Sequence, residues 1–472
     1  MNNLKIPLWI AVALMALSMV LDSCIEDDFT TSPGDVLDFN MDTVAFDTVI
    51  TLQGTATKQL VVYNHSRKQI NISSIKVAGI SSKGHFYLNV DGIKGDTFHD
   101  VEIRGNDSIY IFIEAKLDEM EQDSPTWLED RLEFVTNGMS QKVSLTAWGQ
   151  DVIRLVGDTI DSNRRFTANK PYLIYDTLFV APDDTLTLDA GTTLLFHDKA
   201  ALRCAGTMIA NGTAEAPITF RGDRLDHIVG ETGFDMMSGQ WGGIIFTPPT
   251  TGNVLRHVVM KGSTIGMHCS DTAYSENSKC ALKLVNCVLT NSATNCLVTS
   301  ACYVEAIGTE FSDAAQQVFY VTGGKVVASH CTFANNYLFD LPSDTIVNVF
   351  DVKYNDGTIG KVKADFNNCI IYGMPPEINK GVVHMDVYLR YCLLKSKKED
   401  DAHFINCIWG DPCFLTMRDD QLFDYRLGNE SGAIGKGNPA LCPDEARYDR
   451  YGYDRLARDS VDLGAYVWMP AR

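Results

Sequence analysis

The sequence predicts an all-β protein, in which a β-sandwich is followed by a parallel β-helix. Residues 185–221 alternate short β-rich runs (LTL, TTLLF, TMIA, PITF) with glycine, Ala-Gly and Asn-Gly corners, which leaves no room for a helix. Further along, cysteine-containing segments recur at a fixed interval, as expected for stacked coils that cover one another. Upstream, residues 35–150 contain a series of short alternating runs separated by turn residues.

Length and charge limit the possible partners. The 472 residues are enough for two or three domains. The formal net charge of -20 argues against nucleic acid and anionic lipid surfaces, because both would repel the chain.

The N-terminal residues are predicted to direct export of the protein. Lys5 precedes an apolar run at 6–21, which is short for a membrane span and suits a signal peptide. The run ends in Leu21-Asp22-Ser23-Cys24, which resembles a bacterial lipobox. That resemblance implies a signal peptide at 1–23, acylation of Cys24 (palmitate) and a tether at 24–34.

The acidic cluster Ile25-Glu26-Asp27-Asp28 resembles the surface-export signal of Bacteroidota lipoproteins. It implies an outer-membrane protein exposed at the cell surface, with acyl chains as its only membrane anchor. The alternative is a plain signal peptide with an accidental cysteine.

Residues 35–150 are expected to form the sandwich. Seven alternating runs indicate strands of immunoglobulin-like number and length, at 44–52, 59–63, 70–77, 86–90, 108–115, 131–136 and 141–147. The segments LVVYNHSRKQINISSIKV, DSIYIFIEAKL and RLEFVTNGMSQKVSLTAWG resemble modules related to abnormal-spindle and hydin proteins, which implies a spacer or docking unit. Trp127 and Trp148 are interpreted as core or edge residues rather than a sugar platform.

Residues 151–472 are expected to form the β-helix with a C-terminal capping segment. Cys287, Thr309 and Cys331 are 22 residues apart, which predicts a coil of that length. Cys369, Cys392 and Cys407 continue the series, and His257 is taken as an earlier relative. Its longer intervals predict insertions at 340–360 and 269–280, and its short last interval predicts a trimmed coil.

The repeated cysteines are interpreted as a packing feature. A small apolar thiol fits an inward position stacked on its neighbour at about 4.8 Å. The sequence has no Cys-x-x-Cys pair and no compact Cys/His group, so we expect free thiols and no metal.

The stretch AGTTLLFHDKAALRCAGTMIANGTAEAPITFRGDR, followed by GQWGGI at 239–244, resembles right-handed parallel β-helix proteins of the pectin-lyase-like class found in Bacteroidota. The C-terminal motifs, including 449–455 and 462–466, resemble the closing segment of such proteins, which implies a cap on the last coil. Four residues there belong to this expected cap, or alternatively to a sugar-binding patch: Tyr448, Tyr451, Tyr453 and Arg455.

Carbohydrate-active proteins of this class carry carboxylates, a calcium ion or a Lys/Arg base on an outer face. The best acidic cluster precedes Trp241; the candidate carbohydrate or catalytic residues are Asp223, Asp226, Asp235, Arg221, Arg224 and Trp241. The ordered motif set of polygalacturonases is absent, so solvated turn carboxylates are the favoured interpretation. No cofactor is expected, apart from calcium if the protein is a lyase.

The sequence therefore predicts a lipid-anchored surface protein that binds carbohydrate or acts as a scaffold without catalysis. A polysaccharide lyase or glycoside hydrolase is the first alternative, and a structural adhesin is the second. A polysaccharide is the expected ligand, and the sequence identifies no protein partner.

Overall fold

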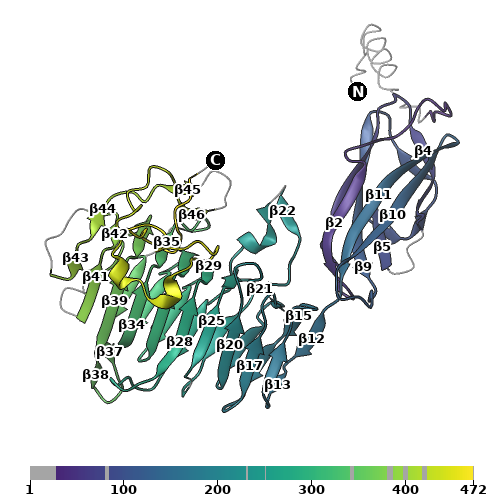
Figure 1. The fold of residues 1–472 in the computed structure, drawn as a ribbon. Helices are drawn as coiled ribbons and strands as arrows, with labels where there is room; N and C mark the ends of the chain where they lie inside the picture. Colours follow the sequence, from purple (N-terminus) through teal and green to yellow (C-terminus); the bar gives the residue numbers. More distant parts are fainter. Residues whose placement is uncertain are drawn as a thin grey trace, which may run out of the picture. The chain divides into compact units, whose positions relative to one another are not determined.

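The computed structural model describes residues 28–79, 84–229, 232–249, 251–340, 345–379, 386–396, 402–416 and 423–470. The expected signal peptide and Cys24 lie outside these ranges. The chain divides into two compact units (Figure 1). Unit 1 runs to Met120 and includes Pro125–Gln150; unit 2 comprises Glu121–Ser124 and the chain from Asp151 onwards. No helix in the described ranges is long and apolar enough to cross a membrane.

Unit 1 contains two sheets of mainly antiparallel strands. The first has the order β1 (Asp38–Phe39), β3 (Lys58–Asn64), β9 (Asp107–Leu117), β5 (Gly84–Val90), β6 (Ile93–Gly95). The second has the order β2 (Thr43–Ile50), β11 (Met139–Gln150), β10 (Thr126–Thr136), β4 (Ile70–Val77), β7 (Thr97–Phe98), with β8 (Val101–Ile103) also paired to β4. Only β2 departs from the antiparallel pattern among these described strands, since it runs parallel to β11. Each of the seven predicted runs falls on a strand.

The alternation of side chains explains the two sheets of unit 1. On β9, Ile111, Ile113 and Ala115 are buried, whereas the alternating residues Tyr110 and Phe112 are exposed. The buried faces of both sheets contribute to one apolar cluster. The core of unit 1 therefore lies between the sheets, and each sheet has an outer face.

Trp127 and Trp148 lie on the outer face of the second sheet. They are direct cross-strand partners on β10 and β11, with ring centroids 5.0 Å apart. Their exposed fractions are 46% and 44%, and β10 and β11 are inner strands of this sheet, so the interpretation of these residues as core or edge residues is wrong. The two indole rings bury part of their apolar surface against each other.

Unit 2 consists mainly of three all-parallel sheets. Sheet A contains β12 (Ile153–Val156), β15 (Tyr172–Tyr175), β18 (Thr193–Phe196), β21 (Ile218–Gly222), β26 (Val258–Lys261), β29 (Val288–Ser292), β32 (Glu310–Ala314), β35 (Thr332–Asn335), β40 (Ile370–Gly373), β42 (Leu393–Leu394) and β44 (Ile408–Trp409). Sheet B contains β13 (Thr159–Ile160), β16 (Thr177–Val180), β19 (Ala201–Cys204), β24 (Gly243–Phe246), β27 (Met267–Ser270), β30 (Leu297–Ser300), β33 (Phe319–Thr322) and β36 (Val347–Phe350). Sheet C contains β14 (Arg164–Phe166), β17 (Thr185–Leu188), β20 (Thr207–Asn211), β25 (Asn253–Arg256), β28 (Cys280–Val285), β31 (Tyr303–Ile307), β34 (Gly324–Ser329), β39 (Val362–Asn367), β41 (Asp386–Arg390) and β43 (Phe404–Ile405).

As far as β40, the chain visits sheets A, B and C in turn and then returns to sheet A one strand further along, which is the path of a parallel β-solenoid (Figure 1). From β40 to β44, the described strands alternate between sheets A and C. The described part of unit 2 also contains short elements outside the three sheets. Its antiparallel strand pairs are β22 (His227–Val229) with β23 (Thr232–Gly233), β37 (Val352–Lys353) with β38 (Ile359–Gly360), and β45 (Phe414–Thr416) with β46 (Asp424–Leu427). Its 3-10 turns are η1 (Phe234–Met236), η3 (Pro439–Leu441) and η4 (Asp444–Ala446).

The register confirms the 22-residue coil. Val288 lies opposite Glu310, and Glu310 opposite Thr332, so Cys287, Thr309 and Cys331 occupy equivalent positions just before their strands. The later pairs Thr332 with Ile370, Ile370 with Leu393 and Leu393 with Ile408 place the other ladder cysteines in the same column. His257 is one residue out of phase, because Val259 pairs with Val288 and so Val258 is level with Cys287.

The predicted insertions have distinct structures. Residues 271–279 form a connection between β27 and β28, within the interval 269–280. The interval 340–360 is only partly an insertion, because it contains β36, a regular strand of sheet B, before the β37–β38 hairpin.

From β25 onwards, each return from sheet C to sheet A turns at a residue with left-handed backbone. These residues have φ between 48° and 56° and are His257, Asn286, Gly308, His330, Asn368, Tyr391 and Asn406. Glycine is required at one of them: a Cβ on Gly308 would lie 2.3 Å from Oδ1 of Asn286 and 3.5 Å from the guanidinium of Arg455. This corner therefore admits a neighbouring side chain from the C-terminal segment.

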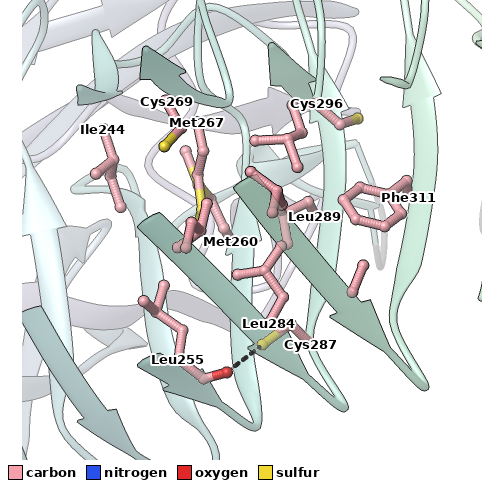
Figure 2. Packing of buried hydrophobic residues seen from close by; sticks show 14 of the residues in the cluster. Ile244, Leu255, Met260, Met267, Cys269, Leu284, Cys287, Leu289, Cys296 and Phe311 are labelled. Atoms are coloured by element: carbon pink, nitrogen blue, oxygen red, sulfur yellow. Dashed lines mark hydrogen bonds between the residues drawn. The ribbon is translucent and has the colours of Figure 1, made fainter. Parts of the chain in front are cut away.

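The interior of the solenoid is apolar and contains thiols. Met260, Leu289 and Phe311 follow one another in register on sheet A, and the thiol of Cys287 donates to the carbonyl of Leu255 at 3.3 Å (Figure 2). The twelve cysteines that the structure describes carry free thiols. Burial raises the pKa of the Cys287 thiol to about 11, which keeps it protonated at neutral pH.

The C-terminal segment, from Phe423, folds back along the solenoid. Glu445 pairs with Arg256 and Lys283 on strands β25 and β28, well before the last coil. Further contacts follow the corner: Asn438 exchanges hydrogen bonds with Asn368, and the Tyr466 hydroxyl donates to Glu310. The segment also covers outer-face residues of sheet A in a second apolar cluster that includes Ile370, Leu393, Leu463 and Ala465.

Candidate functional site

A cavity of 230 Å³ lies over the ends of strands β26, β29 and β32. Its lining comes from four parts of the chain: Asp235 and Met236 on η1; Lys261, Thr290, Asn291 and Asp313 on sheet A; Tyr337, Leu338 and Phe339 after β35; and Phe423 at the start of the C-terminal segment. We call it the sheet A pocket. Polar and aromatic side chains converge in it, which is typical of a small-molecule site.

The floor of the sheet A pocket is a second column of left-handed residues. Lys261, Thr290 and Ser312 are in register, so the residues that follow them are stacked. These are Gly262, Asn291 and Asp313, with φ of 74°, 58° and 55°. Asn and Asp adopt this conformation more readily than other side-chain-bearing residues, which explains their presence at this corner.

Asn291 fixes one wall of the pocket. Its Nδ2 donates to the carbonyls of Asp235 at 3.0 Å and Met236 at 2.6 Å, which holds η1 over sheet A. Asp235 in turn forms an ion pair with Lys261 and another with Arg221 at 3.3 Å. Burial alone would raise the pKa of Asp235, but Lys261 and Arg221 outweigh burial and hold it below its ordinary value. Asp235 is therefore ionised.

Asp313 differs from Asp235 in its ionisation. It is buried, and its Oδ1 accepts hydrogen bonds from the Tyr425 hydroxyl at 2.6 Å and from the backbone N–H of Asn336 at 3.1 Å. Burial raises the pKa of Asp313 to about 7, although these two hydrogen bonds act in the opposite direction. The pocket therefore holds one carboxylate and one carboxyl group that retains its proton close to neutral pH.

A second buried acid, Glu310, lies on the same strand as Asp313. It accepts hydrogen bonds from the Ser312 hydroxyl at 2.6 Å and from Tyr466 of the C-terminal segment. Burial raises the pKa of Glu310. Tyr425 and Tyr466 thus anchor the C-terminal segment on the two acids of β32.

Aromatic side chains form the opposite wall. The Tyr337 hydroxyl lies 2.5 Å from Oγ of Ser238, which joins this wall to the loop that carries η1. Phe339 packs edge-on against Tyr337, with centroids 5.7 Å apart, and is itself half exposed. Phe423 completes the apolar side.

The structure separates the sequence-predicted acids. Asp235 lines the pocket, and Arg221 reaches it through the ion pair. Asp223 instead lies 2.7 Å from Nδ1 of His197, and Asp226 forms a two-point ion pair with Arg224 at 2.6 and 2.7 Å. Neither Asp223 nor Asp226 is among the residues that line the pocket.

Trp241 is a core residue and not a surface platform. It is fully buried and stacks on Phe196 with centroids 4.1 Å apart, and its Nε1 donates to the carbonyl of Lys261 at 3.0 Å. Its ring is therefore inaccessible to a ligand, which corrects its prediction as a carbohydrate-contacting residue.

The four candidate residues of the C-terminal segment differ in their exposure. Arg455 is fully buried and donates to the carbonyls of Gly464 at 3.2 Å and Ala465 at 2.5 Å, so it fastens the segment internally. The other three, Tyr448, Tyr451 and Tyr453, have exposed side chains.

Sequence reasoning missed Lys261, Asp313 and Tyr337. One pattern could have identified Asp313: it follows Asn291 by the same 22-residue interval that relates Cys287 to Thr309, and both sit at the end of a run on sheet A. Tyr337 and Phe423 offered no such pattern, because they follow the regular strands.

Within the described ranges, no three His, Cys, Asp or Glu side chains gather as a metal site. The ionic contacts of the pocket are instead satisfied by Lys261 and Arg221.

The fold and pocket define this chain as an all-β protein with a parallel solenoid and a mixed polar and aromatic cavity on the outer face of sheet A. No protein-family model matches the chain, and no curated protein is similar to it. Among solved structures it is similar to a family 123 glycoside hydrolase from Clostridium perfringens, at 10% identity over 24% of this chain and 26% of that chain, with a TM-score of 0.17. It is also similar to a protein of unknown function from Porphyromonas gingivalis W83 (10% identity, 27% and 60% covered, TM-score 0.18) and to the N-terminal domain of PorA (14% identity, 24% and 97% covered, TM-score 0.18). The matches span less than two thirds of the first two proteins, and at these TM-scores they support no statement about function.

Proposed function

We propose that this protein is a lipid-anchored glycan-binding protein of the bacterial outer surface, in which the sheet A pocket receives one sugar unit of a polysaccharide. The proposal includes a right-handed solenoid, the hand that almost all parallel crossover connections adopt. It also includes an immunoglobulin-like spacer in unit 1. The observation that carries it is the convergence of aromatic rings and fixed polar groups on the pocket.

The chemistry of the lining supports this ligand class. A pyranose ring has apolar C–H faces and a rim of hydroxyl groups, so it suits a pocket with rings on one side and donors and acceptors on the other. Phe339 and Phe423 offer the apolar side, whereas Asn291, Thr290 and Lys261 offer the polar side. The volume of 230 Å³ is below the usual size of drug-ligand pockets, about 300–1,000 Å³, which favours a single ring over a larger ligand.

Binding is tested with the soluble chain from Asp28 onwards, titrated with neutral and uronate-containing oligosaccharides. We expect Phe423→Ala to weaken binding about tenfold, the scale of one lost aromatic contact. Phe350→Ala, on sheet B and outside the pocket, is the matched control. Equal loss in both variants, or no loss in either, would contradict a sugar site at this pocket.

A second candidate function, glycoside hydrolysis, is favoured by the two states of Asp235 and Asp313. A protonated carboxyl group and an ionised one in the same cavity are the groups that acid-assisted cleavage of a glycosidic bond uses. New reducing ends would be assayed over a polysaccharide panel with and without calcium, since calcium dependence would instead indicate a lyase. Release that is abolished in Asp313→Asn but kept in Asp223→Asn would establish hydrolysis at the pocket; the absence of release leaves binding or adhesion as the function.

The lipid anchor is tested separately. Cells fed labelled palmitate should label the chain, and Cys24→Ser should remove the label and release the protein from the membrane fraction. Protease added to intact cells should degrade the wild-type protein, because we propose that the body faces outwards. We propose no cofactor, no nucleic acid and no membrane contact beyond the acyl chains.

A further inference from the structure

Unit 1 has an open groove on the outer face of its first sheet. The groove has a volume of 790 Å³, and its lining belongs to unit 1 alone. Its floor is formed by Tyr87 and Asn89 on β5 and by Phe112, Glu114 and Lys116 on β9. We call it the unit 1 groove.

Strand alternation places these side chains on one surface. Phe112 lies directly opposite Asn89, and Glu114 opposite Tyr87, so the rings of Tyr87 and Phe112 are diagonal neighbours. Such neighbours lie about 7–8 Å apart. Tyr110 follows Phe112 on the same face of β9, about 7 Å further along the strand.

The three rings form an aromatic row across two strands. Tyr87 is 45% exposed, Phe112 41% and Tyr110 50%, whereas Ile111, between the two rings on β9, is buried in the core. Contiguous exposed apolar surface of this kind marks a binding site more often than isolated exposed residues do. The row is about 14 Å long, which exceeds one sugar ring and suits a chain of several.

The polar rim of the unit 1 groove indicates the charge of its ligand. Lys94 and Lys116 lie in the same lining as Asp96 and Glu114, so the two signs cancel. Asn89 and Thr57 add a neutral amide and a hydroxyl. The lining of the groove therefore offers hydrogen-bond donors and acceptors but carries no net charge, which fits a neutral polyhydroxylated ligand.

We infer that the unit 1 groove binds a neutral polysaccharide chain, with pyranose rings stacked along Tyr87 and Phe112 in the groove and then on Tyr110, which lies beyond its lining. Unit 1 would then be a second glycan-binding element, independent of the sheet A pocket, and not only a spacer. Its ligand is a chain bound along an open face, whereas the pocket takes a single unit.

The test is electrophoresis of the soluble chain through native gels that contain one neutral polysaccharide each (xyloglucan, galactomannan, dextran or mannan), with polygalacturonate as an anionic comparison. At least one neutral polymer should retard the wild-type chain. The double variant Tyr87→Ala/Phe112→Ala should lose this retardation, with an affinity at least tenfold lower. The conservative pair Tyr87→Phe/Phe112→Tyr should keep it, because both rings remain.

The matched control is Trp127→Ala/Trp148→Ala, which removes an equally exposed aromatic pair from the other sheet of unit 1. This variant should be retarded as the wild type is. The pocket is assayed separately, by titration with short oligosaccharides, so failure of the pocket proposal is distinguishable from failure of this one. Circular dichroism of each variant establishes that unit 1 is folded. Retardation by none of the neutral polymers, or equal retardation of a folded double variant, would overturn the inference. The inference would also be overturned if sedimentation showed that the wild-type chain self-associates and that the double variant differs from it only by the loss of this self-association.

Discussion

Replacing Asp313 by Asn should change how stability depends on pH. Oδ1 of Asp313 accepts both hydrogen bonds, from Tyr425 and from the backbone of Asn336, and the amide oxygen of Asn can accept the same two. The substitution therefore removes the ionisation and keeps the local geometry. Any difference between the two proteins that varies with pH then reports the charge on Asp313.

The magnitude follows from the raised pKa. Burial raises the pKa of Asp313 from an ordinary 3.8 to about 7, so the folded protein keeps a proton that the unfolded chain has lost between these pH values. The stabilising contribution of the protonated group is complete below pH 3.8 and is lost as the pH rises to about 7, at about 1.36 kcal/mol per pH unit. Over this window the wild type should lose about 4 kcal/mol of unfolding free energy relative to Asp313→Asn.

The assay is urea unfolding of both proteins between pH 4 and pH 8, followed by tryptophan fluorescence. Subtracting one profile from the other cancels the shared groups that do not interact with Asp313. Glu310, whose pKa burial also raises, remains only through its interaction with Asp313. The stability of the variant relative to the wild type should increase with pH and level off above about pH 7. Parallel profiles would refute the assignment of a protonated carboxyl group to the pocket.

Three further predictions concern packing. Gly308→Ala should cost about 2–4 kcal/mol of unfolding free energy, because the new Cβ meets Asn286 in a left-handed conformation, whereas Gly432→Ala, in open space, should cost much less; urea unfolding distinguishes them. Trp241→Ala should cost about 3–5 kcal/mol without loss of glycan binding by the folded protein, and a folded, equally stable variant with weakened binding would restore this residue as a ligand contact. A thiol assay on the chain from Asp28 onwards should find twelve reactive thiols in denaturant without reductant, of which the eight buried ones are unreactive in the native protein; fewer than twelve would reveal disulfides.

The regular part of the fold was predictable because it depends on short-range periodicity. The cysteines at 287 and 331 and Thr309 between them mark one position per coil, and the strand pairs reproduce their spacing. The one-residue error at His257 has a physical cause. Asn286 and His330 have left-handed backbone, and each comes directly before the buried cysteine of its corner. His257 also has left-handed backbone, so it is equivalent to Asn286 and not to Cys287.

The candidate site was only partly predictable because it is assembled from distant segments. Asp235 was identified within an acidic loop, but the loop alone does not show that Lys261 and Arg221 hold it ionised. Asp313 resembles an ordinary turn residue in the sequence, but it is buried and accepts hydrogen bonds from Asn336 and from Tyr425, which is 112 residues later. Trp241 was misassigned because a tryptophan beside charged residues looks the same in sequence whether its ring faces a ligand or packs on Phe196.

The returning C-terminal segment changes how this solenoid can be made. In a simple repeat protein each coil contacts only its neighbours, so folding can spread coil by coil during synthesis. Here the ion pairs of Glu445 with Arg256 and Lys283 join residues 189 and 162 positions apart, which gives the domain contacts of high contact order. Early coils can stack as they emerge, but their outer face is completed only after Glu445 has been released. A truncation before Glu445 would therefore destabilise coils that were synthesised long before it.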